Sequence, residues 1–243
     1  MDKVIYGGHM KRSPDFQAKV KSDAIRQIVM VSLMSFVILI LIVGIVFPTI
    51  KNLPLIVVQI MRFILPFSVL VLPWVYMRQN QESFLDYFKL KGNQKKEIII
   101  GLLCGLSTYI IFGGLFTFIG QNKFPNVSPD INWLKMIYGL FYYIFSIALT
   151  EEILFRGFIF NTFLKIRHSR GLAIAGSSIL FGLYHISHGS LIQVIVTGLM
   201  GFIYCMFREK IKGCTLLSLI IAHGFHNWLI DFVPYIIYVM NRN

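Results

Sequence analysis

The sequence predicts an all-α protein, a polytopic membrane helix bundle with seven or eight transmembrane helices. Of its 243 residues, 56% are hydrophobic and only 14% are charged, and the mean hydropathy is +0.69. A soluble domain has about 25% charged residues. The apolar residues also gather in runs of about 20, the length of helix that crosses the hydrocarbon core of a bilayer.

Seven such runs follow one another along the chain. The first is longer than the core of a signal peptide, and we expect it to be an uncleaved signal anchor. The fourth and seventh are longer than a bilayer requires, and Pro234 could divide the seventh into a span and a short eighth helix. The predicted spans are 27–47, 55–77, 98–119, 132–164, 171–187, 191–208 and 213–240.

The basic residues predict the orientation of these spans. Of the 23 Lys and Arg residues, 17 lie in alternate connecting segments and 3 in the others, while Arg62, Lys135 and Arg156 lie inside spans. Cytoplasmic segments of membrane proteins carry an excess of Lys and Arg. We therefore expect a multi-pass protein of the cytoplasmic membrane with its N-terminus in the cytoplasm and, with seven spans, its C-terminus outside.

We expect one domain in three parts. These are a basic cytoplasmic N-terminal segment (1–26), three accessory transmembrane helices (27–131) and the helices of the functional core (132–243). A short interfacial helix is expected over Ser83–Lys96, where aromatic and apolar residues mix with lysines.

Composition also excludes several classes of partner and cofactor. The net charge of +12 is spread between apolar runs rather than gathered on one face, so no nucleic-acid partner is expected. Cys104, Cys205 and Cys214 form no Cys-x-x-Cys pair, which argues against a disulfide framework or a zinc knuckle. The expected partners are the lipid bilayer and a peptide or protein substrate within it, and the sequence does not predict an oligomeric state.

The most informative residues are two adjacent glutamates inside the fourth span. A charged side chain near the bilayer centre costs roughly 2.5–3.5 kcal/mol, so an intramembrane carboxylate indicates a functional site. Glu152 and Arg156 stand at i and i+4, in the order that favours an ion pair on one helix. That pairing leaves Glu151, about 100° further round the helix, free to act as a general base.

Polar residues on two later spans are predicted to lie at the same depth. Glu151, His185 and Asn227 each stand 14 residues from the inner end of their own span, which is roughly 21 Å of helix. His223 lies one turn before Asn227 on the same face. His223 and Asn227 carry donors suited to a developing oxyanion. His185 could hold a water molecule against Glu151, or take and return a proton.

These residues carry a family resemblance. Glu151-Glu152-x-x-x-Arg156, Phe181-x-x-x-His185 and His223-x-x-x-Asn227 match, in order and spacing, the motifs of the CPBP intramembrane proteases, which include CAAX prenyl endopeptidases and bacterial Abi proteins. The resemblance covers roughly residues 132–235 and implies hydrolysis of a peptide bond within the membrane. By it, Glu151 and His185 activate water, His223 and Asn227 form the oxyanion hole, and Glu152 and Arg156 are supporting residues.

The cofactor stays open at this point. A glutamate-activated water that requires no metal is favoured, because the chain lacks a His-Glu-x-x-His helix, the stronger zinc signature. The alternative is zinc bound by Glu151, His185 and His223 with one open position.

Two further functions compete with an endopeptidase that processes a small secreted or membrane-associated peptide. One is a non-catalytic membrane protein that binds a peptide, as in bacteriocin immunity. The other is a proton-coupled transporter, although no pair of broken helices marks an internal repeat.

Other polar and small residues are expected to be structural. His188 and His226 are expected to form interhelical hydrogen bonds, and His168 is expected in a solvated loop. Ser178-x-x-x-Gly182 and Gly101-x-x-x-Gly105 are expected to let helices pack closely.

Overall fold

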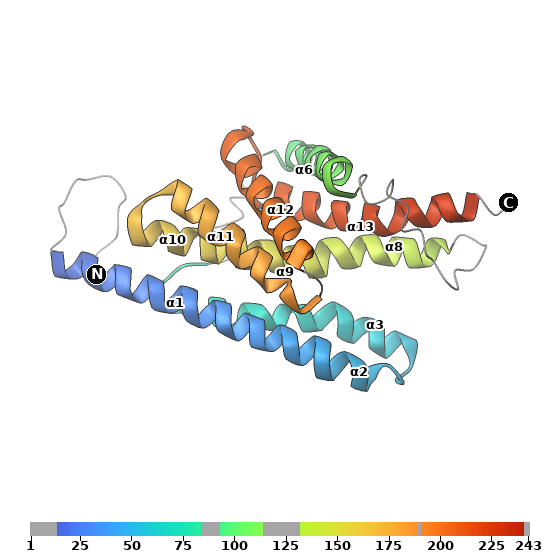
Figure 1. Ribbon diagram of the computed structural model, residues 1–243, viewed down its shortest axis with the longest axis horizontal. Helices are drawn as coiled ribbons and strands as arrows, with labels where there is room; N and C mark the ends of the chain where they lie inside the picture. The colour runs from blue at the N-terminus through green and yellow to red at the C-terminus, as the bar shows by residue number, and fades with distance from the viewer. Residues whose placement is uncertain (1–13, 84–92, 114–131, 189–190, 241–243) are drawn as a thin grey trace.

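The computed structural model describes residues 14–83, 93–113, 132–188 and 191–240, which form helices joined by short turns and contain no strand (Figure 1). Six helical segments are long and apolar enough to cross a membrane. They are Pro14–Ile50, Leu55–Gln79, Gln94–Gly113, Trp133–Arg167, Leu191–Lys210 and Leu216–Met240. The predicted class, a polytopic all-α membrane protein, is therefore confirmed. The interfacial helix predicted for 83–96 falls mainly outside the described residues.

Several of these segments contain turns of π or 3-10 geometry. The first consists of α1 (Pro14–Leu41), the π segment η1 (Ile42–Val46) and α2 (Phe47–Ile50). The second consists of α3 (Leu55–Ile64), the 3-10 segment η2 (Leu65–Leu70) and α4 (Val71–Gln79). The third consists of α6 (Gln94–Thr108) and the π segment η3 (Tyr109–Gly113).

The fourth segment contains two π stretches around a single α-helical turn. It runs through α8 (Trp133–Tyr142), η4 (Tyr143–Ala148), α9 (Leu149–Glu152), η5 (Ile153–Ile159) and α10 (Phe160–Arg167). After it come α11 (Arg170–Tyr184), the 3-10 turn η6 (Ile186–His188), α12 (Leu191–Lys210) and α13 (Leu216–Met240).

Short polar residues start the helices. The side chains of Asn93, Asn132 and Ser169 accept hydrogen bonds from backbone N–H groups in the first turns of α6, α8 and α11. Thr215 and Ser218 bond reciprocally at the start of α13. Because these N–H groups have no partner within the helix, the caps explain why the spans begin close to the predicted residues.

The count of seven or eight spans is not confirmed. The fifth predicted span is α11, which has only 15 residues, or about 22 Å of helix, against roughly 30 Å of hydrocarbon. Pro234 does not divide the last span, because α13 continues through it to Met240. A proline is tolerated there because neighbouring groups in a helix bundle can satisfy the freed carbonyl.

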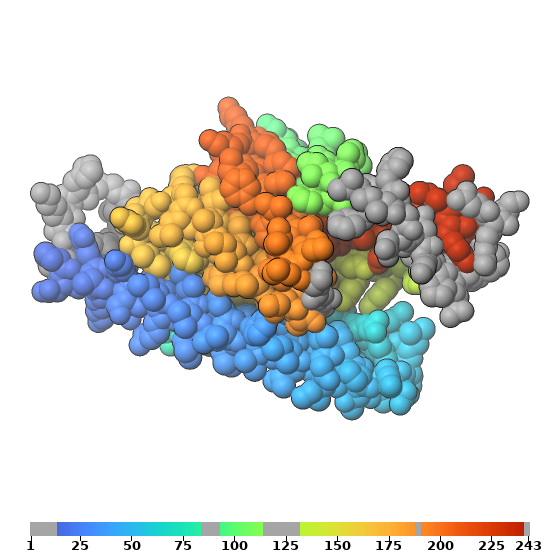
Figure 2. All heavy atoms as spheres, viewed as in Figure 1, coloured from blue at the N-terminus to red at the C-terminus, as the bar shows by residue number. Residues whose placement is uncertain are grey.

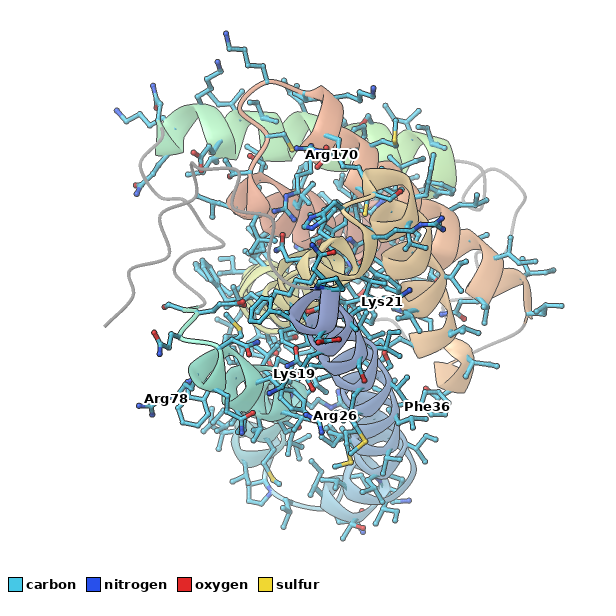
Figure 3. The ribbon with its side chains drawn as sticks, turned by 90° about the vertical axis from the view of Figure 1, so that its left-hand side faces the viewer. Lys19, Lys21, Arg26, Phe36, Arg78 and Arg170 are labelled. Carbon is cyan, nitrogen blue, oxygen red and sulfur yellow. The ribbon has the colours of Figure 1, made fainter. Side chains whose placement is uncertain are left out.

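The basic segments gather at one end of the molecule. Figure 3 views that end and labels Lys19, Lys21, Arg26, Arg78 and Arg170 on it. Two ion pairs join segments there: Lys165 with Glu82 at 2.5 Å, and Arg170 with Glu209. Residues of α1, α4 and α11, from three of the predicted basic segments, therefore lie at one end of the molecule.

Helix α13 is the most buried span and packs against α6 and η4. In Figure 1, α12 crosses steeply over the other helices and packs on α11, while α1 runs along one edge of the molecule (Figure 2). The outer faces carry large exposed apolar side chains, among them Leu33, Leu55, Ile64 and Leu103. Such faces suit contact with lipid.

Glycines permit the closest helix contacts. A Cβ on Gly101 or Gly105 of α6 would lie 2.7 and 2.6 Å from backbone carbonyl oxygens of α13, those of Ser218 and Ala222. A Cβ on Gly182 of α11 would lie 2.6 Å from Val194 O in α12. The close packing predicted for the Gly101-x-x-x-Gly105 and Ser178-x-x-x-Gly182 patterns is confirmed at these glycines.

Gly224 of α13 generates a testable prediction. A Cβ there would lie 2.6 Å from Ile144 Cα and 2.8 Å from Ile144 N in η4, so Gly224→Ala must push the two helices apart. Overpacking of this kind costs about 1–3 kcal/mol, equivalent to a melting temperature lower by about 2–12 °C in a chain of this size. Thermal melting of the purified protein in detergent measures it.

Gly44→Ala is the matched control, because nothing lies within 4 Å of the Cβ position at Gly44. It should leave the melting temperature unchanged or slightly raised, since alanine has the higher helix propensity. Equal melting temperatures for the two variants would contradict the close approach at Gly224.

Candidate active site

The two glutamates lie on a single α-helical turn between two π stretches. Glu151 and Glu152 end α9, with η4 before them and η5 after them. A π turn adds a residue to the helical repeat and is frequent at functional sites. Both side chains are buried, Glu152 completely, so each carboxylate needs polar partners within the protein.

Glu152 is held by two partners at one oxygen. Arg156 Nη1 donates to Glu152 Oε1 at 2.9 Å, and both side chains are completely buried. His223 Nδ1 lies 2.9 Å from the same Oε1 atom. The predicted ion pair within the helix is therefore present. The structure adds a bond from α9 to α13 that the sequence analysis did not anticipate.

Arg156 is enclosed by aromatic rings and a glycine. Its guanidinium carbon lies 4.3 Å from the centre of the Phe181 ring and 5.5 Å from that of Tyr204, in reach of cation–π attraction. A Cβ on Gly201 would lie 3.2 Å from Nη2. Arg208 supports the same turn from α12, because its Nη1 donates to the carbonyl oxygen of Arg156 at 2.5 Å.

Glu151 faces two histidines instead of a cation. Its Oε2 atom lies 3.8 Å from His185 Nε2 and 3.8 Å from His223 Nε2. These distances are too long for direct hydrogen bonds, and Oε2 has no hydrogen-bond partner among the described residues. Oε2 of Glu151 therefore lies near one histidine nitrogen at the end of α11 and another on α13, without a direct hydrogen bond to either.

The partners of the other ring nitrogens indicate where the histidine protons lie. His185 Nδ1 lies 2.9 Å from the backbone carbonyl oxygen of Phe181, which can only accept, so Nδ1 carries the hydrogen. Glu152, the ion-pair partner of Arg156, likewise accepts from His223 Nδ1. In the neutral rings, both Nε2 atoms therefore present lone pairs towards Glu151.

This geometry has a chemical consequence. Two imidazole lone pairs and a carboxylate oxygen do not attract one another directly, and a bound water molecule would bridge them. A water molecule in that position could donate hydrogen to Oε2 or to Nε2. The site is therefore suited to polarising and deprotonating a water molecule.

A cavity of about 670 Å³ opens beside this cluster, within the size range of ligand pockets. Glu151, His185, His223 and Asn227, the four residues predicted to be catalytic, all contribute to its wall. Glu152 and Arg156 are not among its lining residues and lie behind Glu151 and His223. The arrangement separates a row that faces the cavity from a buried pair that supports it.

Sequence reasoning missed some residues of the site. His226, which was expected to be structural, is buried and lines the cavity, and its Nδ1 has no hydrogen-bond partner among the described residues. Arg62 of α3 also lines the cavity. The sequence did contain one signal for Arg62, its position inside a predicted span. The count of basic residues noted that position, but no role was inferred from it.

The candidate ligands Glu151, His185 and His223 are of the chemical types that zinc prefers, but they do not lie close enough together to bind it. Two neutral imidazoles, each with its other nitrogen bound to a carbonyl or carboxylate oxygen, resemble the second-shell pattern of zinc ligands, and Glu151 would complete three protein ligands. Across the described residues, however, no three His, Cys, Asp or Glu side chains lie close enough together to form a metal site. Side-chain movement would be needed to bind a metal.

The fold and the site together define a polytopic membrane protein with a buried glutamate–histidine centre. Residues 133–229 match the family model described as Type II CAAX prenyl endopeptidase Rce1-like. The matched segment runs from α8 into α13 and agrees with the CPBP resemblance predicted from the three motifs. No curated protein and no solved structure gives a significant match to the chain.

The buried ion pair generates a testable prediction. Arg156→Ala leaves Glu152 buried without its cation, which typically costs about 3–5 kcal/mol, or a melting temperature lower by about 6–20 °C. The control is Arg26→Ala, which removes the exposed ion pair between Arg26 and Asp23 and should change the melting temperature by no more than about 2 °C. An Arg156→Ala protein as stable as the wild type but inactive would assign Arg156 a direct role with substrate.

Proposed function

We propose that this protein is an intramembrane endopeptidase of the CPBP type that cleaves a small secreted or membrane-associated peptide precursor. The observation that carries the proposal is the position of Glu151, a carboxylate in a cavity within the membrane, with two histidine nitrogens at 3.8 Å. The family match supports the reaction class, since the matched family is one of proteases.

In the proposed mechanism, Glu151 is the general base. A water molecule between Oε2 and His185 Nε2 loses a proton to Glu151 as its oxygen bonds to the carbonyl carbon of the scissile peptide. The carbonyl oxygen becomes a tetrahedral oxyanion. When the carbon–nitrogen bond breaks, the leaving amine takes the proton back from Glu151, directly or through His185.

His223 and Asn227 are proposed to stabilise the oxyanion. The Asn227 amide has N–H donors as it stands. His223 can donate from Nε2 only when its ring is doubly protonated, because Nδ1 is already bonded to Glu152. Glu152 is therefore proposed to orient the His223 ring as well as to balance Arg156.

The test of the general base is the substitution Glu151→Gln, which keeps the shape of the side chain and removes its basicity. We expect the purified protein to stay folded and to lose cleavage. His185→Ala should do the same, and the double variant should be little worse than either single one, because residues that act as a unit are not additive. The measurement is the rate of cleavage in reconstituted membranes.

The matched control is Glu97→Gln. Glu97 is another buried glutamate, it accepts a hydrogen bond from Thr215 at 2.9 Å, and it is not among the described residues that line the cavity. This variant should keep its activity. Additive losses in the Glu151 and His185 variants, or equal losses in the Glu97 variant, would count against the assignment.

The metal-free mechanism is proposed ahead of zinc, and one set of variants separates them. If zinc is bound by Glu151, His185 and His223, then His223→Ala should lose stoichiometric metal and Asn227→Ala should keep it. If the mechanism is metal-free, Asn227→Ala should lower turnover about 100- to 1,000-fold with little change in substrate affinity. The purified active protein should then contain no stoichiometric metal and resist chelators.

A non-catalytic role in peptide binding is the second candidate function. The same cavity could hold a peptide without cleaving it, and Glu151→Gln distinguishes the two. If the biological activity, such as protection from a bacteriocin, survives in Glu151→Gln, the protein acts by binding. A proton-coupled transporter remains the weaker alternative, favoured only by the intramembrane Glu and His residues themselves.

We also propose that the end bearing Lys19, Arg78 and Arg170 faces the cytoplasm, in the cytoplasmic membrane. A helical hairpin of α11 and α12 returns the chain to that end whether or not α11 crosses the bilayer fully, so the charge alternation does not depend on seven complete spans. In intact cells, a membrane-impermeant maleimide should label Asn52→Cys but not Lys212→Cys. The reverse pattern would invert the orientation.

A further inference from the structure

Arg62 is a cation inside a span with no ion-pair partner. It lies in the last turn of α3, seven residues from Leu55, or about 10 Å into the span. Among the described residues no carboxylate forms an ion pair with it, in contrast to Arg156. Its guanidinium carbon instead lies 5.5 Å from the centre of the Phe47 ring. Because a charge at this depth is costly, its presence indicates a function.

Arg62 opens onto the same cavity as Glu151. Among the described residues that line this cavity, Arg62 is the single lysine or arginine and Glu151 the single acid. Tyr142 lies in the wall and is within electrostatic reach of both. The cavity therefore carries a negative group at its reactive end and a positive group elsewhere on its wall.

Contacts between the helices fix the separation of the two charges. Ser146 Oγ donates to Phe63 O at 2.7 Å, which places the residue after Arg62 level with Ser146. Ser146 precedes Glu151 by five residues, or about 7.5 Å of helix. Arg62 thus lies on the side of Glu151 away from the basic end of the molecule, a few residues of extended peptide from the reactive carboxylate.

We propose that Arg62 is a specificity-determining residue that binds a carboxylate of the peptide on that side of the scissile bond. The inference rests on the proposed function for the identity of the occupant. A guanidinium binds a carboxylate with two parallel N–H···O bonds, and Arg62 is exposed, so its guanidinium is accessible to such a group. The carboxylate comes either from a Glu or Asp side chain or from the end of the peptide chain.

The experiment measures binding, so that it does not depend on cleavage. The protein carries Glu151→Gln and is placed in nanodiscs of phosphatidylcholine. The probes are three fluorescent N-acyl tripeptides, identical except for their charge. One has a free terminal carboxylate, one has a terminal amide and a glutamate side chain, and one has a terminal amide and a glutamine side chain. Fluorescence anisotropy gives each dissociation constant.

We expect at least one acidic probe to bind about 10- to 100-fold more tightly than the neutral probe. The acidic probe that does so identifies the source of the carboxylate. Adding Arg62→Gln should bring all three dissociation constants within about twofold of one another. Adding Arg78→Gln should keep the preference, because Arg78 stacks on Trp74 and does not line the cavity among the described residues.

Two outcomes would overturn the proposal. One is equal binding of acidic and neutral probes, or no binding, with Arg62 in place. The other is a preference for acidic probes that persists after Arg62→Gln; Arg62 would then only bind lipid phosphate at the outer surface. Wild-type cleavage assays are scored separately, so absence of cleavage together with the expected binding pattern would reject the endopeptidase and keep the subsite.

Discussion

The arrangement of this protein depends on one buried carboxylate with two partners. Glu152 Oε1 accepts from Arg156 on its own helix and from His223 on α13. In a medium without water, each of these groups alone would be costly to bury. Together they join the fourth span to the last, fix the hydrogen of His223 on Nδ1 and leave Nε2 directed at Glu151. The buried Glu152–Arg156 pair and the residues that face the cavity are thus two sides of one network.

The geometry of the surrounding helices brings the polar groups of this network close to one another. The π stretches η4 and η5 enclose the turn that carries both glutamates, and glycines let α6, α11, α12 and α13 approach at backbone distance. Arg208 binds the carbonyl oxygen of Arg156 within η5, and Phe181 and Tyr204 cover the guanidinium. Each of these features helps to position a polar group. Apolar packing alone would not do so, because it does not distinguish protein neighbours from lipid.

Sequence patterns were enough for features that depend on one helix at a time. Helix depth follows from counting residues, so the common level of Glu151, His185 and Asn227 was predictable, as was the Glu152–Arg156 pair at i and i+4. The bond between His223 and Glu152 depends on how two helices are rotated towards each other, which no periodicity records. The π turns change the repeat inside largely apolar stretches, and α11 ends at Tyr184, three residues before the predicted end of its span at 187.

Arg62 and Pro234 both show the limit of prediction from local sequence. A count of charges recorded Arg62 inside a span, but only the packing of Phe63 against Ser146 relates it to the site. Proline predicted a break in the last span, and α13 nevertheless continues through Pro234. Rules based on the local sequence describe the free-energy cost of placing a residue in a helix or a membrane. The neighbouring residues decide whether that cost is offset.

The shortness of α11 bears on how water, the second reactant of any hydrolysis, comes to a site surrounded by lipid. The last carbonyl groups of a helix have no partners within it, and hydrocarbon offers none. Helix α11 ends at Tyr184, beside His185, whose ring and backbone N–H groups donate to the carbonyl oxygens of Phe181 and Gly182. A carbonyl oxygen can accept a second hydrogen bond, so the end of α11 provides polar atoms beside the cavity, where the proposed hydrolysis would take up its water.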